Sequence, residues 1–508
     1  MILMNNQIIK LAGLAIACAV ISACDTDFDN PVGDKASSSG TADFSTFVTI
    51  GDSLTAGYAD SALYLSGQES SYPSVLAAQF AKAGGGSFAQ PLVSDNLGGL
   101  LFGGNPNPDF DNRLVLDAET ESPEPIAGTP TTEVIGSGLN GMTFNNMGVP
   151  GAKSFHLAAP NYGDAAGLAG GTANPYFVRF ASAAATTMIA DAATQQPSFY
   201  VMWIGNNDVL SYATSGGIGA DSCNPLVVIC GSNDITDPVA FAGVYAGLVG
   251  AFTAANPDVK GVLVNIPDVS TIPHFTTVPY NPVPLDQATA DALNSNPNYI
   301  AYNGGLQSAV GAVPGFTQEE ADARTISFVA GQNAVVIDDE SLTDLTGLGL
   351  PSMRQATAED FIVLPAGAYI GTEDQNSVGT TPPAGLPWGI GTPLADSDVL
   401  IPSEILVINT ARLAYNATIE AAADADDNLI FFDVAAIMET LSTEGIDYGT
   451  GFVDDTYVTG GAFSLDGIHP TARGYTVIAN SMIDDINTGF GASVLRVDPS
   501  ASTTVFFK

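Results

Sequence analysis

Short apolar runs that stop at a glycine or a small polar residue recur along this chain, and they constrain its fold more than any other feature. Runs of this length, rich in β-branched and aromatic residues, predict strands that are buried on both faces. Segments with a helical pattern separate the runs, and this alternation is typical of a parallel sheet covered by helices on both sides. We therefore predict a doubly wound α/β fold. The five expected strands are residues 47–50, 143–147, 199–204, 261–266 and 429–433.

The chain has 508 residues, which is long enough for several domains. Its motifs nevertheless lie near both ends, so we predict one domain at residues 44–490, with large insertions and a C-terminal extension at 491–508. The expected insertions are about 84–140, 209–236 and 275–400. The expected helices are residues 73–83, 177–193, 238–255, 402–422, 434–441 and 471–486, and a small hairpin is expected at 452–463.

The insertion at 275–400 is too long to be a bare loop, so it should have structure of its own. It leaves the sheet at the edge where a doubly wound fold keeps its chemistry, which suggests a cap over the site. Its apolar runs, residues 334–337 and 361–364, could line an acyl pocket. They could equally form a small core within the insertion.

The N-terminus has the pattern of an export signal. Residues 1–23 contain one basic residue, Lys10, and an apolar run that is too short to span a membrane. The small residues before Cys24 resemble a bacterial lipoprotein box, which implies cleavage before Cys24 and attachment of lipid to it. Ordinary secretion is the alternative. Residues 24–43 then read as a flexible tether, and the expected location is the bacterial cell envelope, at the outer membrane or cell surface.

Cys223 and Cys230 lie close together in the remainder of the chain, which is otherwise free of cysteine. In an exported protein this spacing predicts a local disulfide. Metal binding by the pair is disfavoured because no histidine or further cysteine lies near it.

The chain has 13 basic and 54 acidic residues and a net charge of −41. This charge excludes nucleic-acid binding, which needs a cationic surface. Because 46% of the residues are hydrophobic, the chain is globular, and the acidic excess reads as a solvated surface. The acidic clusters at 338–340 and 424–427 lack the spaced ligands of an EF-hand loop, so no metal site is predicted.

A Gly51-Asp52-Ser53-Leu54 turn follows the first expected strand. Ser53 is therefore the candidate nucleophile at the carboxyl end of a strand. The Gly-x-Ser-x-Gly elbow of α/β-hydrolases is not matched, since Thr55 stands two residues after the serine. The tetrapeptide alone is weak evidence for a nucleophile, because Gly, Asp and Ser are also common turn formers.

A serine nucleophile needs a base and an acid that orients the base. Of three histidines, His469 alone follows an aspartate, Asp466, by three residues in a turn that begins a helix. Asp466 can then accept from Nδ1–H of His469 and leave Nε2 facing Ser53. His156 and His274 are fallback bases, and a helix cap with a surface histidine is the alternative reading of the turn.

Together these motifs resemble those of the SGNH, or GDSL-type, esterase and lipase family. The blocks that carry the resemblance are Gly51-Asp52-Ser53-Leu54, Asn146-Met147-Gly148-Val149-Pro150-Gly151, Gly205-Asn206-Asn207-Asp208 and Asp466 with His469. The resemblance covers about half of the chain, and it implies a flavodoxin-like three-layer sandwich around a five-stranded parallel sheet. It further implies nucleophile Ser53, base His469 and acid Asp466, with oxyanion donors from the N–H groups of Ser53 and Gly151 and the amide of Asn207.

The resemblance implies a lipid-anchored serine esterase or lipase that hydrolyses carboxylic esters through an acyl-enzyme. Neither a metal nor an organic cofactor is expected. Substrates would be esters of small molecules, lipids or polysaccharides, and the membrane would be reached through the N-terminal lipid. Two alternatives remain: a polysaccharide O-deacetylase of the same fold, and a non-catalytic glycan-binding lipoprotein.

Overall fold

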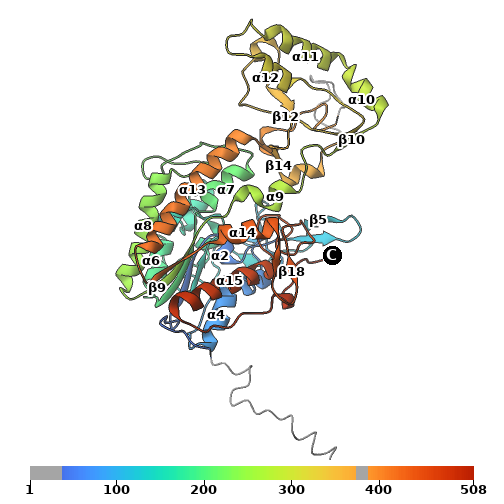
Figure 1. Ribbon diagram of the computed structural model, residues 1–508. Helices are drawn as coiled ribbons and strands as arrows, with labels where there is room; N and C mark the ends of the chain where they lie inside the picture. The colour runs from blue at the N-terminus through green and yellow to red at the C-terminus, as the bar shows by residue number, and fades with distance from the viewer. Residues whose placement is uncertain (1–36, 373–386) are drawn as a thin grey trace, which may run out of the picture.

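The computed structural model describes residues 37–372 and 387–508. The expected signal, Cys24 and most of the tether lie outside the described residues. Figure 1 shows a sheet with helices packed around it, and a smaller body built from residues of the expected 275–400 insertion that projects from one end.

The central sheet has five strands, all parallel. Its spatial order is β16-β9-β8-β1-β7, which is 2-1-3-4-5 reversed when the strands are numbered along the chain. This is a doubly wound order, and it confirms the predicted α/β class and strand number. The strands are β1 (Phe47–Gly51), β7 (Asn146–Gly148), β8 (Phe199–Trp203), β9 (Lys260–Val264) and β16 (Leu429–Phe432).

Alternate residues of each strand enter two different cores, because successive side chains of a strand point to opposite faces. In β8, Tyr200 and Met202 pack in one core, whereas Val201 and Trp203 pack in the other. The first core is covered by α6 (Met188–Ala193), α8 (Pro238–Ala255) and α13 (Pro402–Asp424). The second is covered by α4 (Tyr72–Lys82) and α15 (Ala472–Phe490). The sheet is therefore the middle of three layers.

Among the described residues, α8 alone is long and apolar enough to cross a membrane by length and composition. Phe241, Tyr245, Leu248 and Phe252 on one side of this helix are buried against the sheet. The core helix of a globular protein passes the same test, although only 28% of α8 is buried.

Three local expectations are wrong. The helix expected at 177–193 is two short helices, α5 (Pro175–Val178) and α6, because Thr187 caps a new helix by accepting from Ala190 N–H. The insertion expected at 209–236 begins inside α7 (Asn207–Thr214). The small hairpin is formed earlier than expected, by β17 (Ile446–Asp447) and β18 (Phe452–Val453).

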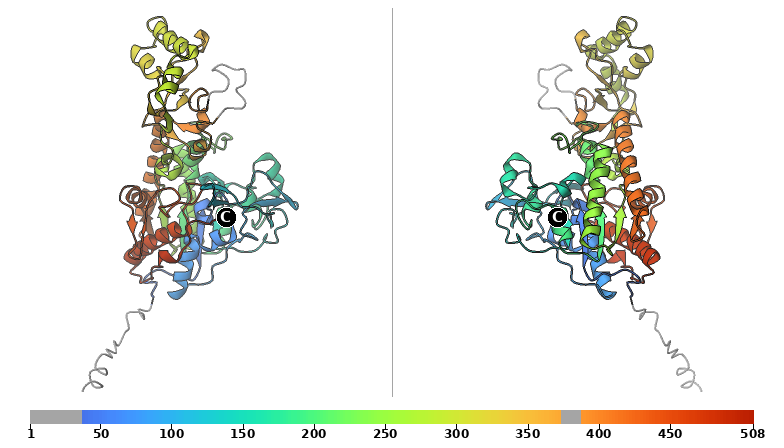
Figure 2. Two further views of the ribbon diagram at one scale, coloured as in Figure 1. Left: turned by 90° about the vertical axis from the view of Figure 1, so that its right-hand side faces the viewer. Right: turned by 90° about the vertical axis from the view of Figure 1, so that its left-hand side faces the viewer.

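The insertion at 84–140 forms small sheets beside the core, and Leu116 N–H donates to Phe506 O near the C-terminus. The insertion at 275–400 has its own helices and strand pairs, and in both views of Figure 2 its outer part stands away from the sheet. The remaining α-helices are α2 (Ser53–Ala56), α3 (Leu65–Glu69), α9 (Pro273–Thr276), α10 (Gln287–Asn294), α11 (Pro297–Ala309), α12 (Gln318–Arg324) and α14 (Val434–Thr443). The remaining strands are β2 (Leu100–Phe102), β3 (Asn105–Pro106), β4 (Leu114–Asp117), β5 (Ser122–Pro125), β6 (Thr132–Glu133), β10 (Val283–Leu285), β11 (Gly331–Asn333), β12 (Val336–Asp338), β13 (Met353–Gln355), β14 (Phe361–Ile362) and β15 (Val399–Leu400).

Candidate active site

Ser53 is separated from β1 by Asp52 alone and is the first residue of the short helix α2. Asp52 caps this helix, since its side chain accepts from Leu54 N–H at 3.0 Å. The other oxygen of Asp52 accepts from Asn206 Nδ2 at 2.9 Å, which ties the end of β1 to the end of β8. Burial raises the pKa of Asp52 to about 6, although both hydrogen bonds lower it. The serine is thus fixed at the carboxyl edge of the sheet.

The predicted serine, histidine and aspartate are brought together in one chain of hydrogen bonds. Nε2 of His469 lies 2.9 Å from Oγ of Ser53, and Nδ1 of His469 lies 2.9 Å from Oδ2 of Asp466. These distances are within hydrogen-bond reach for a nucleophile, its base and the acid that orients the base. The ring of Tyr58 packs beside the imidazole, with ring centroids 4.7 Å apart.

Asp466 is held as a carboxylate. Burial alone would raise its pKa, but the charge of His469 and the hydrogen bonds it accepts hold its pKa well below the usual range. The donors include the N–H groups of His469 and Ile468 at 2.8 Å and that of Ser61 at 2.9 Å. A carboxylate that accepts several such bonds is strongly favoured over its protonated form.

The loop that supplies Ser61 is a functional element that the sequence analysis did not find. Asp60 and Ser61 both have left-handed backbone conformations, with φ of 52° and 63°. Such residues are strained, and here their surroundings hold them: Asp60 N–H donates to Ser464 Oγ, and Asp60 Oδ1 accepts from Leu465 N–H. The loop therefore buttresses Asp466. No local pattern in the sequence marks it, because its partners are more than 400 residues away.

The three expected oxyanion donors line one cleft with Ser53. Gly151 has φ +77°, which favours glycine, and open space surrounds its α-carbon apart from Asn174. Within the described residues, the N–H groups of Ser53 and Gly151 donate to no acceptor. Asn207 uses one amide hydrogen to reach Ala152 O at 3.0 Å, and its second meets no acceptor within the described residues.

Asp208, the last residue of its motif, lies beneath this donor group. It is fully buried and accepts from Ser154 N–H at 2.8 Å and Ser154 Oγ at 2.7 Å. These bonds fix the turn that carries Gly151. Burial raises the pKa of Asp208, partly opposed by these hydrogen bonds.

Neither fallback histidine contacts the serine. His156 Nδ1 accepts from Lys153 N–H at 3.0 Å, and its ring stacks on Tyr162, so burial lowers its pKa to about 4. His274 is buried behind the turn from Asp466 to His469, where its backbone N–H donates to Gly467 O at 3.0 Å. Burial also lowers the pKa of His274, although a hydrogen bond to the backbone of Asp466 partly raises it. His469 is the base that the geometry favours.

The cleft beside Ser53 has a volume of about 390 Å³. Contrary to the cap prediction, none of the described residues of the 275–400 insertion, 275–372 and 387–400, lines it. Most of the two apolar runs is instead buried in the large hydrophobic core: Val335, Val336, Ile337, Ile362 and Val363. The insertion at 84–140 contributes to the cleft in its place. The lining residues are Ser53, Tyr58, Ser61, Asp109, Phe110, Asp111, Pro150, Gly151, Asn174, Pro175, Tyr176, Asn207, Leu210, Ser211, Thr214, Ile468 and His469.

The two cysteines expected to pair form a disulfide, so their sulfur atoms are not free to bind a metal. In the acidic cluster at 338–340, Asp339 pairs with Arg354, with Oδ2 and Nε 2.5 Å apart. Glu340 lies beside Asp396 and Glu404. Burial raises the pKa of Glu404 to about 8, opposed by the hydrogen bond that its carboxylate accepts from Ile401 N–H.

In comparisons with known proteins, no family model, no curated protein and no solved structure matches this chain.

Proposed function

We propose that this protein is a serine esterase of the SGNH type, anchored by lipid at Cys24 in the bacterial cell envelope, that hydrolyses carboxylic esters. The observation that carries the proposal is the pair of 2.9 Å contacts that link Ser53 to His469 and His469 to Asp466. The order of the five parallel strands also agrees with the flavodoxin-like sandwich of that family.

The arrangement supports a two-step reaction. Nε2 of His469 takes the proton of Ser53 Oγ as the oxygen attacks the ester carbonyl, and the N–H groups of Ser53, Gly151 and Asn207 receive the negative oxygen. The intermediate expels the alcohol, which leaves with the proton from His469. Water then attacks the acyl-serine by the same route and releases the acid and the free enzyme.

The experiment that tests this proposal is reaction with a fluorophosphonate probe and with p-nitrophenyl acetate. We expect the wild-type protein to be labelled at Ser53 and to hydrolyse the ester, and Ser53→Ala to do neither while unfolding at an unchanged temperature. Thr55→Ser is the control, because it changes a neighbouring residue and leaves Ser53 intact. It should be labelled and active like the wild type. A Ser53→Ala variant that retains more than a few per cent of the activity would refute the role of Ser53.

Polysaccharide O-deacetylation is the second candidate, and the rim of the cleft favours it. Rings of Phe110 and Tyr176 stand at right angles with centroids 5.9 Å apart, and the polar side chains of Asp109, Asp111 and Asn174 lie on the same cleft. Aromatic faces and hydrogen-bonding groups together suit a sugar. Acetate release from acetylated xylan at a higher kcat/KM than from a simple acetyl ester would favour this substrate class. Absence of labelling by the fluorophosphonate probe would instead favour a non-catalytic glycan-binding protein.

A further inference from the structure

Four consecutive aliphatic side chains stand in solvent at the tip of the loop that the disulfide closes. Leu226, Val227, Val228 and Ile229 are 64%, 75%, 56% and 102% exposed. Single exposed aliphatic residues are ordinary, but a contiguous apolar patch on a protein surface marks a contact site.

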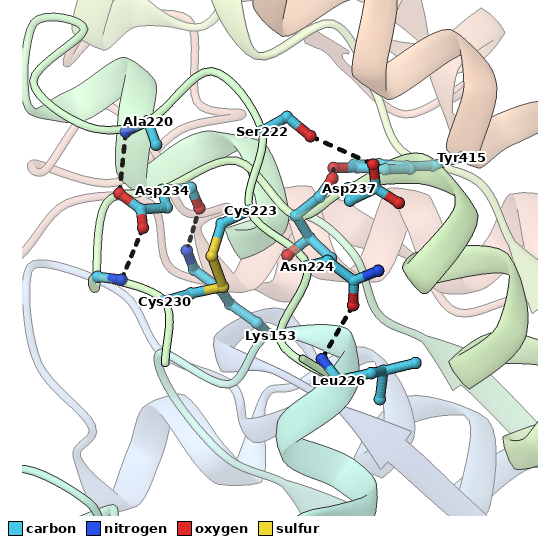
Figure 3. The surroundings of a disulfide bond; sticks show 12 residues. Lys153, Ala220, Ser222, Cys223, Asn224, Leu226, Cys230, Asp234, Asp237 and Tyr415 are labelled. Atoms are coloured by element: carbon cyan, nitrogen blue, oxygen red, sulfur yellow. Dashed lines mark hydrogen bonds between the residues drawn. A yellow bond between two sulfur atoms is a disulfide. The ribbon is translucent and has the colours of Figure 1, made fainter. Parts of the chain in front are cut away.

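A disulfide and several hydrogen bonds fix the base of this loop, so the loop holds its tip in an exposed position. The Cys223–Cys230 disulfide closes it, and Cys223 N–H donates to Ile235 O at 2.7 Å. The carboxylate of Asp234 accepts from the N–H groups of Ala220 and Gly231. Figure 3 shows these groups gathered around the disulfide. A loop that is already ordered loses little conformational entropy on binding.

Further exposed aliphatic residues lie on the helix that follows the loop and on the helix packed beside it. The loop runs into α8, whose residue Val239 is 78% exposed, and α8 has no charged residue along its whole length. Helix α13 packs beside α8 and exposes Leu406 and Leu413.

We propose that the tip Leu226–Val227–Val228–Ile229 inserts into a neutral or zwitterionic lipid surface and forms a membrane contact separate from the N-terminal lipid. The tip is aliphatic throughout and has none of the Trp, Tyr and Arg side chains that dominate protein interfaces. The loop bears the acidic residues Asp221 and Asp234, and the chain has a net charge of −41, which excludes attraction to anionic lipid.

The contact would place the cleft near the membrane. Helix α7, which precedes the loop, supplies Asn207, Leu210 and Thr214 to the cleft. The loop is also tied to the turn that carries Gly151. Lys153, two residues after Gly151, donates from Nζ to Asp234 O of the loop at 2.6 Å. The lipid contact itself does not depend on the proposed hydrolysis.

Tryptophan fluorescence tests the loop locally, whatever else binds the membrane. Val228→Trp is compared with Val329→Trp, a site in the 275–400 insertion with a similar exposure of 59%. Both are made in the full chain with Cys24→Ser, and both keep the native Trp203 and Trp388. We expect brominated phosphatidylcholine vesicles to quench Val228→Trp strongly and Val329→Trp no more than the parent. Equal quenching of the two variants overturns the proposal.

A second variant measures the energetic role of the tip. Val228→Asp in the same background should weaken partitioning onto phosphatidylcholine vesicles on the order of ten-fold, because a charge cannot enter the lipid. The parent protein, with Cys24→Ser alone, should bind phosphatidylglycerol vesicles more weakly than phosphatidylcholine vesicles, because both the protein and this lipid are negatively charged. Unchanged partitioning of Val228→Asp overturns the proposal, as does a self-association in sedimentation that this variant abolishes, since the tip would then be an interface between copies of the chain.

Discussion

The side-chain amide of Asn207 has two N–H groups, and the folded chain uses one of them to donate to Ala152 O. The second is free to face the negative oxygen of a tetrahedral intermediate beside Ser53. In the proposed reaction this second N–H is the one that would act. At the scale of single residues, Asn207 and Asp52 are the positions at which the chemistry can be tested most sharply.

Asn207→Ala should lower kcat by about 10²–10³ and leave KM nearly unchanged, because the lost donor acts only in the transition state. Ser211→Ala is a matched control, since Ser211 lines the same cleft and its hydroxyl donates to Asn207 O. Steady-state kinetics with an acetyl ester measure both. A rise in KM alone would identify Asn207 as a binding residue.

Asp52→Asn should change how stability depends on pH. The native carboxyl, with a pKa raised to about 6, binds a proton more tightly than the unfolded one. Its contribution therefore favours the native state at low pH and is lost as the pH rises from about 4 to 6. In the variant, Asn206 can turn so that its unpartnered Oδ1 accepts from the new amide.

We expect the stability of Asp52→Asn relative to the wild type to rise by roughly 2–3 kcal/mol between pH 4 and a pH above 6, because only the wild type loses this contribution. The pKa of Asp60 is also raised to about 6, and this residue is unchanged in the variant. The dependence of the unfolding free energy on pH between 4 and 6 should therefore fall by about half. Urea unfolding at a series of pH values measures this. Parallel curves for the two proteins would contradict the prediction.

At the scale of elements, the insertion at 84–140 is the one that shapes the cleft. Its segment around Phe110 brings Asp109 and Asp111 to the rim, and the lining residues include no lysine or arginine. The carboxylates have no hydrogen-bond partner for their side chains within the described part of the chain. A cleft with this charge should attract cationic substrates and repel anionic ones.

The double variant Asp109→Asn with Asp111→Asn should lose preference for a cationic ester. The pair to compare is acetylcholine and its neutral isostere 3,3-dimethylbutyl acetate. We expect the ratio of their kcat/KM values to fall by about 3–10-fold at low salt and by less at high salt, because exposed charges are screened. Asp258→Asn with Asp427→Asn, near the opposite ends of the strands, should leave the ratio unchanged. An equal effect of both double variants would show that net charge alone sets the preference.

At the scale of the whole molecule, the 275–400 insertion braces the site without covering it. Its base packs against the turn from Asp466 to His469, where Leu364 and the backbone N of His274, just before the insertion, lie 3.0 Å from the position that a Cβ on Gly467 would take. The chain enters and leaves near this base, since Val278 bridges Ile362 and Ile362 pairs with Val399. The outer helices stand further away (Figure 2).

Replacement of residues 279–398 by a short Gly/Ser linker should leave the preference among acyl lengths unchanged, because no residue in the described part of the insertion lines the cleft. The kcat for an acetyl ester should fall several-fold, since Leu364 no longer supports the turn. Activity against p-nitrophenyl esters of increasing acyl length measures both. A changed acyl-length profile in a folded variant would restore the cap interpretation.

The sequence by itself determined the class of fold and the candidate triad. Strand runs, turn residues and the spacing of Asp466 and His469 are local patterns, and local patterns reflect local physics. The same holds for the cysteine pair. It also determined the order of the main helices, except where Thr187 starts a new helix within an apolar stretch.

Only the tertiary structure decided which insertion borders the cleft, how Asp60 and Ser61 support Asp466, and that the tip of the disulfide loop stands in solvent. Each depends on contacts between residues far apart in the chain, such as the bond from Ser61 N–H to Asp466. Apolar runs look alike in sequence whether they enter a core, as Val335 does, or remain exposed, as Ile229 does. Burial is a property of packing, and packing exists only once the chain has folded.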